Sequence, residues 1–217
     1  MKYSKLYKRY SEDEMIKRSS EYRDEIKRKR TVRDFSPENI PDEVLENCLE
    51  AVASAPNGAN KQPWTYVVVK NPEVKALIRE KAEEIERGFY GGKAGQGWLD
   101  DLEHLGTNWK KPFLTEAPVL IVAFAQTYGL REDGVKEKHY YVSESVGLAN
   151  GFLVSALHNA GLASLTYTPA PMRFLNDLLD RPLNERPVMV IVTGYPHPDA
   201  EVPDITKKDL TEYSIFL

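Results

Sequence analysis

The 217-residue chain has a single cysteine, Cys48, which excludes a disulfide bond within the chain. It also lacks an apolar run of about 18 to 20 residues, and no apolar stretch stands near its start. Neither sign of charge dominates, because 29 Lys and Arg residues stand against 33 Asp and Glu residues, a formal net charge of -4. This balance argues against bulk nucleic-acid binding but leaves room for a local basic patch. We expect a cytoplasmic protein that binds neither nucleic acid nor a membrane.

The hydrophobic content of 41% is enough to form the core of one substantial domain, or of a domain with arms. Apolar periodicity and turn residues predict alternating helices and strands. Helices are predicted over residues 41–55, 74–90, 139–160 and 171–180, and strands over residues 64–69, 118–125, 162–168 and 188–195. The helix over residues 139–160 is rich in Gly, Ala and Ser, which permits close packing against a partner. Cys48 shares the apolar face of the first helix, so we expect a buried thiol rather than a nucleophile.

The two ends of the chain differ in character from its middle. Residues 1–27 are charged and show weak helical periodicity, which predicts a helical arm lying on a larger body. Residues 201–217 combine charges with a final Ser-Ile-Phe-Leu, and such a C-terminal extension is expected to cross onto a second subunit.

Several motifs carry a resemblance to a known family. KRTVRDFS at 29–36, APNGANKQPW at 55–64, LTYTP at 165–169 and GYP at 194–196 resemble, in order and spacing, the FMN-dependent nitroreductase superfamily. EEIERGFY, WLDDLEHLGTNWKK and HYYVSESVGLA further resemble the iodotyrosine deiodinases within it. The resemblance covers about residues 28–210. It implies an α+β nitroreductase fold, with a central mixed sheet flanked by helices, in a domain-swapped homodimer. It also implies a soluble prokaryotic form with an FMN-binding domain over residues 28–200.

The basic stretch at the start of that domain is a candidate phosphate site. Cations and a hydroxyl on a short extended segment can hold a terminal phosphate through charge-assisted hydrogen bonds, but the same run also fits a solvated basic segment. The resemblance assigns Lys29, Arg30, Thr31 and Arg33 to the flavin phosphate and ribityl chain, together with Lys207. The family often has arginine where Lys29 and Lys207 stand, and lysine cannot make the planar bidentate contact.

The loop at residues 55–64 is dense in turn chemistry. Asn57-Gly58 is a turn signal, and the prolines on either side fix φ, so the loop is stiff and presents its amides. By itself it fits an ordinary turn as well as a ligand-binding loop. The resemblance implies that Pro56, Asn57 and Gly58 lie against the flavin. It implies also that the amide of Ala59 donates to the phenolic oxygen of the substrate, since a preorganised N–H stabilises a phenolate.

A third set of candidates, Thr166, Tyr167 and Thr168, ends a predicted strand, where ligands of α/β sheets commonly bind. All three are also ordinary strand formers. The resemblance assigns them to the flavin and gives Thr168 the catalytic position, where a hydrogen bond to flavin N5 favours single-electron steps.

The last set, Glu86, Tyr90 and Lys111, lies at the ends of a glycine-rich stretch. Glu86 and Tyr90 are four residues apart and share a helix face. Taken singly, each fits an ordinary surface residue. The resemblance makes them the clamp for a halotyrosine, with Glu86 on its ammonium group and Lys111 on its carboxylate. GFYGGKAGQGW lacks both phosphate-loop and Rossmann patterns, so residues 86–111 are predicted to form a lid that orders with substrate.

The function implied is FMN-dependent reductive dehalogenation of halotyrosines such as iodotyrosine, giving tyrosine and halide. The electron donor would be an NAD(P)H-linked reductase or a ferredoxin-type protein. Two alternatives remain open, namely a broad-specificity nitro or quinone reductase and a flavin-binding or storage protein. The four histidines have no metal-ligand spacing, so no metal site is expected.

Overall fold

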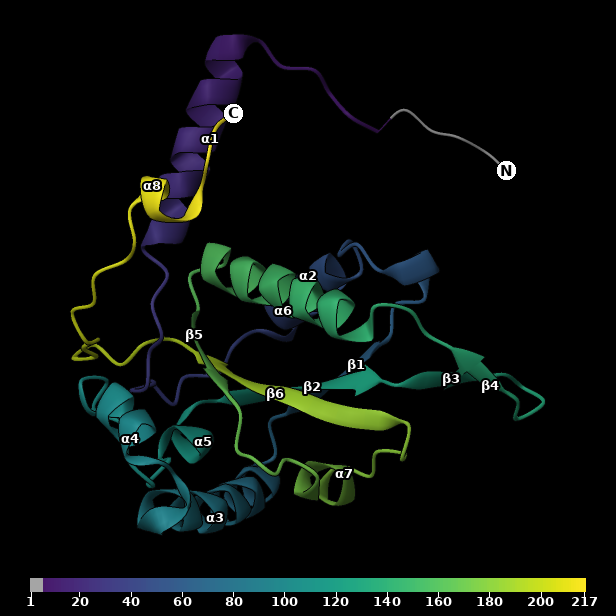
Figure 1. Cartoon of the computed structure of the whole chain (residues 1–217), viewed down its shortest axis with the longest axis vertical. Coiled ribbons are helices and arrows are strands. Elements are labelled where there is room, and N and C mark those ends of the chain that lie inside the picture. Colours follow the sequence, from purple (N-terminus) through teal and green to yellow (C-terminus); the bar gives the residue numbers. More distant parts are fainter. Residues whose placement is uncertain (1–5) are drawn as a thin grey trace.

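A four-stranded antiparallel sheet forms the centre of the computed structural model, which describes residues 6–217 (Figure 1). Its order is β1-β2-β6-β5, with β1 spanning Trp64–Val69, β2 Val119–Gln126, β6 Glu185–Gly194 and β5 Ala163–Tyr167. Every neighbouring pair of these strands is antiparallel. The sequence resemblance predicts a mixed sheet. The parallel pairing in the structure is an isolated bridge between Thr31 and Ser164 at the β5 edge.

Helices cover both faces of the sheet (Figure 1). One face carries α2 (Asp42–Val52) and α6 (Val142–Asn159), and the other carries α3 (Pro72–Gly88), α5 (Phe113–Glu116) and α7 (Phe174–Leu178). Successive residues of β2 point to opposite faces, so Phe124 packs on the α3 side and Ile121 on the α6 side. Since both faces are covered, β2 has the continuous apolar sequence predicted for a buried strand.

The helix boundaries follow local backbone chemistry. Asn71 begins α3 by accepting hydrogen bonds from two backbone N–H groups of the first turn, and Gly161, at φ +82°, follows α6 as expected. α6 begins at residue 142 instead of 139, because Tyr141 adopts a left-handed φ of 50° that no helix can continue through. Cys48 is buried on α2, as predicted.

Smaller segments connect these main elements. A five-residue π-helical turn over Phe89–Lys93 continues α3, and α4 (Gln96–Glu103) follows it. A two-stranded hairpin, β3 (Tyr128–Leu130) with β4 (Lys136–Lys138), connects β2 to α6. A 3-10 turn over Gly58–Asn60 precedes β1.

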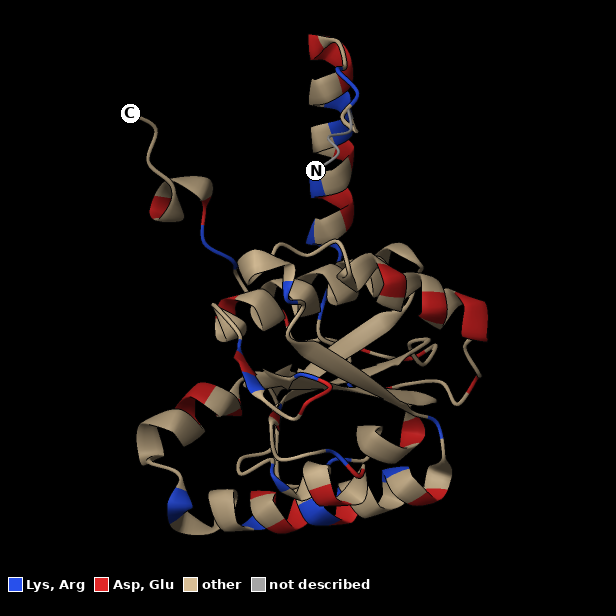
Figure 2. Cartoon of the chain, turned by 90° about the vertical axis from the view of Figure 1, so that its right-hand side faces the viewer, with Lys and Arg blue, Asp and Glu red and all other residues tan. Residues whose placement is uncertain are grey.

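The ends of the chain stand apart from the body. α1 (Glu12–Lys27) projects away from it and has no buried residue, and the C-terminal segment with α8 (Leu210–Tyr213) leaves it separately (Figure 2). α1 contacts α6 through His158, whose Nε2 lies 2.9 Å from the carbonyl oxygen of Glu25. No helix in the part of the chain described here is both long and apolar enough to cross a membrane.

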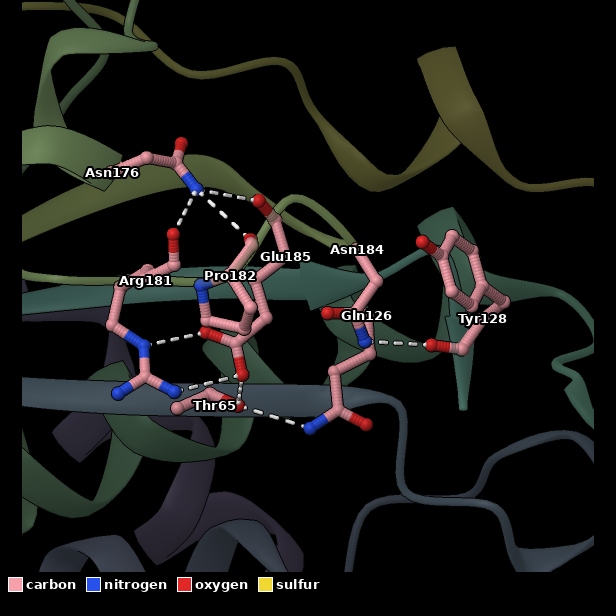
Figure 3. Close-up of polar contacts among 8 residues, drawn as sticks. All are labelled: Thr65, Gln126, Tyr128, Asn176, Arg181, Pro182, Asn184 and Glu185. Carbon is pink, nitrogen blue, oxygen red and sulfur yellow. Dashed lines mark hydrogen bonds and ion pairs between the residues drawn. The ribbon is translucent and has the colours of Figure 1, made fainter. Parts of the chain in front are cut away.

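A buried polar network stabilises the sheet at the start of β6 (Figure 3). The Glu185 carboxylate accepts two hydrogen bonds from the Arg181 guanidinium, at 2.7 and 3.2 Å, and one from the Thr65 hydroxyl at 2.6 Å. The Asn176 amide donates to the Glu185 carbonyl oxygen at 2.8 Å. Because these bonds satisfy a buried carboxylate, they tie α7 and β6 to β1.

Candidate functional site

A cavity of about 700 Å³ opens between the end of β5, the last turn of α3 and the segment that follows α4. This size suits a small-molecule ligand. The predicted site residues in its lining are Arg33, Glu86, Tyr90, Lys111, Thr166, Tyr167 and Thr168. Phe89, Trp98, Leu102 and Leu105 give it an apolar wall. The structure therefore brings Glu86, Tyr90 and Lys111 together with the end of β5 in one cavity.

Glu86 and Lys111 form an ion pair inside this cavity. The Lys111 ammonium lies 3.3 Å from Glu86 Oε2, and the two side chains are only 7% and 13% exposed, respectively. Burial lowers the pKa of Lys111, while the neighbouring carboxylate of Glu86 opposes that shift. The same ammonium donates to the carbonyl oxygen of Asn108. The two clamp charges thus neutralise each other in this structure.

Tyr167 supplies the second partner of Glu86. Its hydroxyl donates to Glu86 Oε1 at 2.9 Å, and its ring packs edge-to-face on Phe113 with centroids 5.5 Å apart. Burial, reinforced by the charge of Glu86, raises the pKa of Tyr167, so the phenol stays a donor. Thr166 and Thr168, on either side of Tyr167 in the chain, are exposed and also line the cavity. The resemblance assigns Tyr167 to the cofactor, and this contact with Glu86 is not apparent from the sequence.

Tyr90 links the two ends of the segment of residues 86–111, which the sequence predicts to be a lid. Its hydroxyl shares a hydrogen bond of 2.5 Å with the hydroxyl of Thr107, and Lys111 Nζ lies 5.4 Å from its ring centroid. Phe89 packs edge-to-face on Trp98, with centroids 5.0 Å apart. Sequence reasoning did not single out Thr107, because a threonine in a loop carries no local signal of such a contact.

The basic residues gather where the end of α1 meets the C-terminal segment. Burial lowers the pKa of Lys29, and the positive charge of Lys207 lowers it further. Arg30 donates to the carbonyl oxygen of Pro203 in the same segment. Within residues 6–217, neither lysine has an acidic partner in an ion pair. Cations without an acidic partner can bind an anion.

The next residues of the predicted phosphate segment connect this cluster to the cavity. Thr31 forms the parallel bridge to Ser164 beside β5, and Arg33 reaches the cavity lining two residues further on. Burial lowers the pKa of Arg33. The predicted phosphate site and the predicted clamp therefore lie along one edge of the sheet.

The loop at residues 56–59 lies elsewhere. It precedes β1, the outer strand opposite β5, and none of its residues lines the cavity. Gly58 packs so closely on the segment before α6 that a Cβ would stand 2.6 Å from the carbonyl oxygen of Tyr140. The structure thus separates this part of the predicted site from the clamp within one chain.

The loop holds a strained conformation through one side chain. Ala59, Asn60 and Gln62 have φ of 52°, 55° and 45°, values that cost energy in residues other than glycine. Asn57 closes the loop, because its Oδ1 accepts from the Gln62 N–H at 2.8 Å and its amide donates to the Ala55 carbonyl oxygen at 3.1 Å. Strain retained in this way is typical of a functional loop.

No cluster of three or more His, Cys, Asp or Glu side chains suited to a metal ion occurs within residues 6–217. The adjacent Asp100 and Asp101 lie exposed on α4, on a solvated face of the helix.

The fold and this site have clear relatives among known proteins. The model of the nitroreductase family matches residues 26–195, so the chain belongs to that family. A crystal structure of a nitroreductase with bound FMN from Bacteroides fragilis shares the fold, with a TM-score of 0.68 at 21% identity over 91% of this chain and 99% of that one.

Other relatives define the group within the family. Iodotyrosine deiodinase of Haliscomenobacter hydrossis is 50% identical over 92% of this chain and 90% of its own length, and that of Hydra vulgaris is 47% identical over 95% and 76%. The crystal structure of oxidized iodotyrosine deiodinase bound to FMN and 3-iodo-L-tyrosine has a TM-score of 0.76 at 34% identity, covering 90% of this chain and all of that one. The chain belongs with the iodotyrosine deiodinases.

Proposed function

We propose that the chain is an FMN-dependent oxidoreductase that removes halogen reductively from halotyrosines such as iodotyrosine, giving tyrosine and halide. The buried pair of Glu86 and Lys111 in a ligand-sized cavity carries this proposal. A free amino acid carries one ammonium and one carboxylate. Each of these groups can replace one member of the pair as the ionic partner of the other. When such a zwitterion enters, Glu86 binds its ammonium and Lys111 its carboxylate, so no charge is left buried and unpaired. Tyr90 offers a further hydroxyl.

The basic cluster fits the phosphate of FMN. Two lysines without acidic partners among the described residues, with Arg30 and Arg33 nearby in sequence, form a cationic site on one edge of the sheet. FMN, when bound, supplies the two electrons of the reaction. Lys29, Arg30, Thr31, Arg33 and Lys207 would hold its phosphate and ribityl chain.

The end of β5 would contact the flavin ring through Thr166, Tyr167 and Thr168. Thr168 lines the cavity and is exposed, so its hydroxyl and N–H can donate toward a ligand. Its catalytic role would be a hydrogen bond at flavin N5 that favours transfer of electrons one at a time. Tyr167 would act chiefly on Glu86, whose orientation its hydroxyl fixes.

A second copy of the chain would complete the site. Pro56, Asn57, Gly58 and Ala59 lie on the opposite edge of the sheet from the clamp, so a homodimer can bring one copy's loop to the other's cavity. There the N–H of Ala59 would donate to the phenolic oxygen of the substrate, and a preorganised donor stabilises a phenolate.

Features outside the loop support the same assembly. Leu148 and Phe152 are exposed on α6, and Gly147 and Gly151 beside them have open space around them. The exposed C-terminal Ile-Phe-Leu and the projecting α1 are further apolar surface for a partner to cover. The helical arm of residues 1–27 and the extension of residues 201–217 would thus exchange between subunits around a domain of residues 28–200.

The reductant would be an NAD(P)H-linked reductase or a ferredoxin-type protein, and the cytoplasm, which holds both, would be the location. The decisive experiment compares turnover of iodotyrosine and of a nitroaromatic by the reduced, FMN-loaded protein. Iodide and tyrosine released in equal amounts would support the proposal. Reduction of the nitroaromatic without any deiodination would instead establish a broad nitro or quinone reductase, and no turnover of either would indicate a flavin-binding protein.

A further inference from the structure

Helix α3 holds the segment that follows the lid by a row of side chains on one face. Lys75 donates to the carbonyl oxygen of Ala117 at 2.7 Å, and Arg79 donates to the hydroxyl of Thr115 at 2.8 Å. Glu83 is the next residue of the row, since positions four apart lie above one another on a helix. The row thus fixes the chain from residue 117 back toward the clamp.

Glu83 makes the contact nearest the ligand. Its Oε1 accepts from the backbone N–H of Lys111 at 2.9 Å and from Arg79 Nε at 2.8 Å. Its side chain is 12% exposed. Burial disfavours ionisation, but the bonds from Lys111 and Arg79 prevail and hold the pKa of Glu83 below its usual value. A charged acceptor therefore fixes the backbone of the residue whose ammonium pairs with Glu86.

One helix consequently sets both charges of the clamp. Glu86 lies in the last turn of α3 itself, and Lys111 is tied to the preceding turn through Glu83. A lysine side chain has four rotatable bonds, so its ammonium is placed accurately only if its backbone is held. A displacement of about 1 Å at such a site is enough to weaken ligand binding.

We propose that Glu83 is a positioning residue for the amino-acid end of the substrate. Its side chain accepts hydrogen bonds from Arg79 and from the backbone of Lys111, and it acts by holding that backbone so that the Lys111 ammonium meets the carboxylate of an α-amino acid. The inference rests on the proposed function, because it names the part of a halotyrosine that depends on Glu83.

Three substitutions separate the hydrogen bond from the charge. Glu83→Leu removes both hydrogen bonds, and Glu83→Asp keeps the charge but shortens the side chain by one methylene, so it cannot reach Lys111. Glu83→Gln keeps both bonds, because a single oxygen accepts them and the amide has one oxygen to offer. Iodotyrosine should bind Glu83→Leu and Glu83→Asp about tenfold or more weakly, the scale of a lost charge-assisted hydrogen bond, and Glu83→Gln within about threefold of the parent.

Titration calorimetry with the oxidised, FMN-loaded proteins supplies the measurement, and 2-iodophenol, which lacks both charged groups, supplies the reference ligand. In turnover, KM for iodotyrosine should rise while kcat changes by less than about twofold. The matched control is Glu84→Gln, which removes a carboxylate from an exposed position of the same helix. It should bind both ligands as the parent does.

Two results would overturn this inference and leave the proposed function standing. One is parental binding of iodotyrosine by both Glu83→Leu and Glu83→Asp. The other is an equal loss of iodotyrosine and 2-iodophenol, which would make Glu83 a general structural residue. If Glu83→Leu fails to fold, Glu83→Asp, which keeps charge and polarity, decides between these outcomes. A parent protein that binds no iodotyrosine would overturn the proposed function, and this inference with it.

Discussion

The Lys111 ammonium and the Glu86 carboxylate lie 3.3 Å apart in the lining of the cavity. Under the proposed function, each would lose the other as its counter-ion when an amino acid binds. Substrate would therefore compete with an internal ion pair, and only a ligand with both an ammonium and a carboxylate could replace both partners. The pair would discriminate against phenols that carry neither group, because such a ligand gains nothing by separating it.

The clamp predicts a selective loss of affinity. Glu86→Gln and Lys111→Met each remove one charged contact, worth on the order of 1.5 to 3 kcal/mol in a site that excludes water. Affinity for iodotyrosine should fall by about one to two orders of magnitude, and binding of a halophenol should scarcely change. Ligand titration against flavin fluorescence measures both. Unchanged binding of iodotyrosine by both variants would contradict the clamp.

The same pair predicts a non-additive effect on stability. Either single substitution leaves a buried charge without its counter-ion and should lower the free energy of unfolding by about 1 to 3 kcal/mol. The double variant Glu86→Gln/Lys111→Met leaves no unpaired charge. Its loss of unfolding free energy should therefore be smaller than the sum of the losses in the two single variants. Urea denaturation of the four proteins gives the coupling. Simple additivity would show that the two side chains do not interact in solution.

Lys111 predicts a pH dependence of substrate binding. Its ammonium is the form that binds a carboxylate, and burial lowers its pKa from the ordinary 10.5. Affinity that depends on Lys111 is therefore full at pH below the lowered pKa and is lost as pH rises through it, before an ordinary lysine would deprotonate. Titration of 3-iodotyrosine across this range should show a phase that Lys111→Met lacks. The ligand's own amine and phenol titrate equally in both proteins.

The close contact at Gly58 predicts that this position tolerates no side chain. A Cβ there meets Tyr140 at 2.6 Å from its carbonyl oxygen and 2.8 Å from its Cβ, and relief of such overpacking costs about 1 to 3 kcal/mol. Gly58→Ala should displace the strained loop, and FMN should dissociate more readily from the protein. Gly97→Ala is the control, since open space surrounds that residue. Equal FMN retention by the two variants would argue against a flavin role for the loop.

The exposed apolar stripe of α6 predicts dimerisation. Leu148→Glu places a charge in the proposed interface and should produce a monomer with reduced FMN content. Leu183→Glu changes an equally apolar, more exposed residue away from α6 and should leave the dimer intact. Light scattering and the visible absorption of the purified variants test this. A monomeric parent protein with full FMN occupancy would contradict the proposed role of the dimer in FMN binding.

Local chemistry was enough to predict most elements of the fold. The strand over Trp64–Val69 was predicted to the residue, because a proline precedes it and its β-branched residues match a half-buried surface. The start of α6 was placed three residues too early, since the periodicity of its apolar residues extends through Tyr141 while the left-handed backbone there does not. A left-handed φ at a residue other than glycine cannot be predicted from the pattern of apolar residues.

The site was predictable in its parts more than in its connections. The motifs indicated Glu86 and Lys111 as a pair, and the structure places them in contact. The bond from Tyr167 to Glu86 joins residues 81 apart in the chain, and the bond from the Lys111 N–H to Glu83 spans 28. Such contacts depend on how β5 and α3 pack, which no short window of sequence contains.

Arg30 donates to the carbonyl oxygen of Pro203, so the chain that follows α1 meets the C-terminal segment at the predicted phosphate site. A phosphate bound there would act as a removable cross-link between the arm and the C-terminal extension. Loss of the cofactor would release both ends together and offer them to proteases. The lifetime of the protein in the cell would then follow its flavin content, and flavin-starved cells would clear the empty form first.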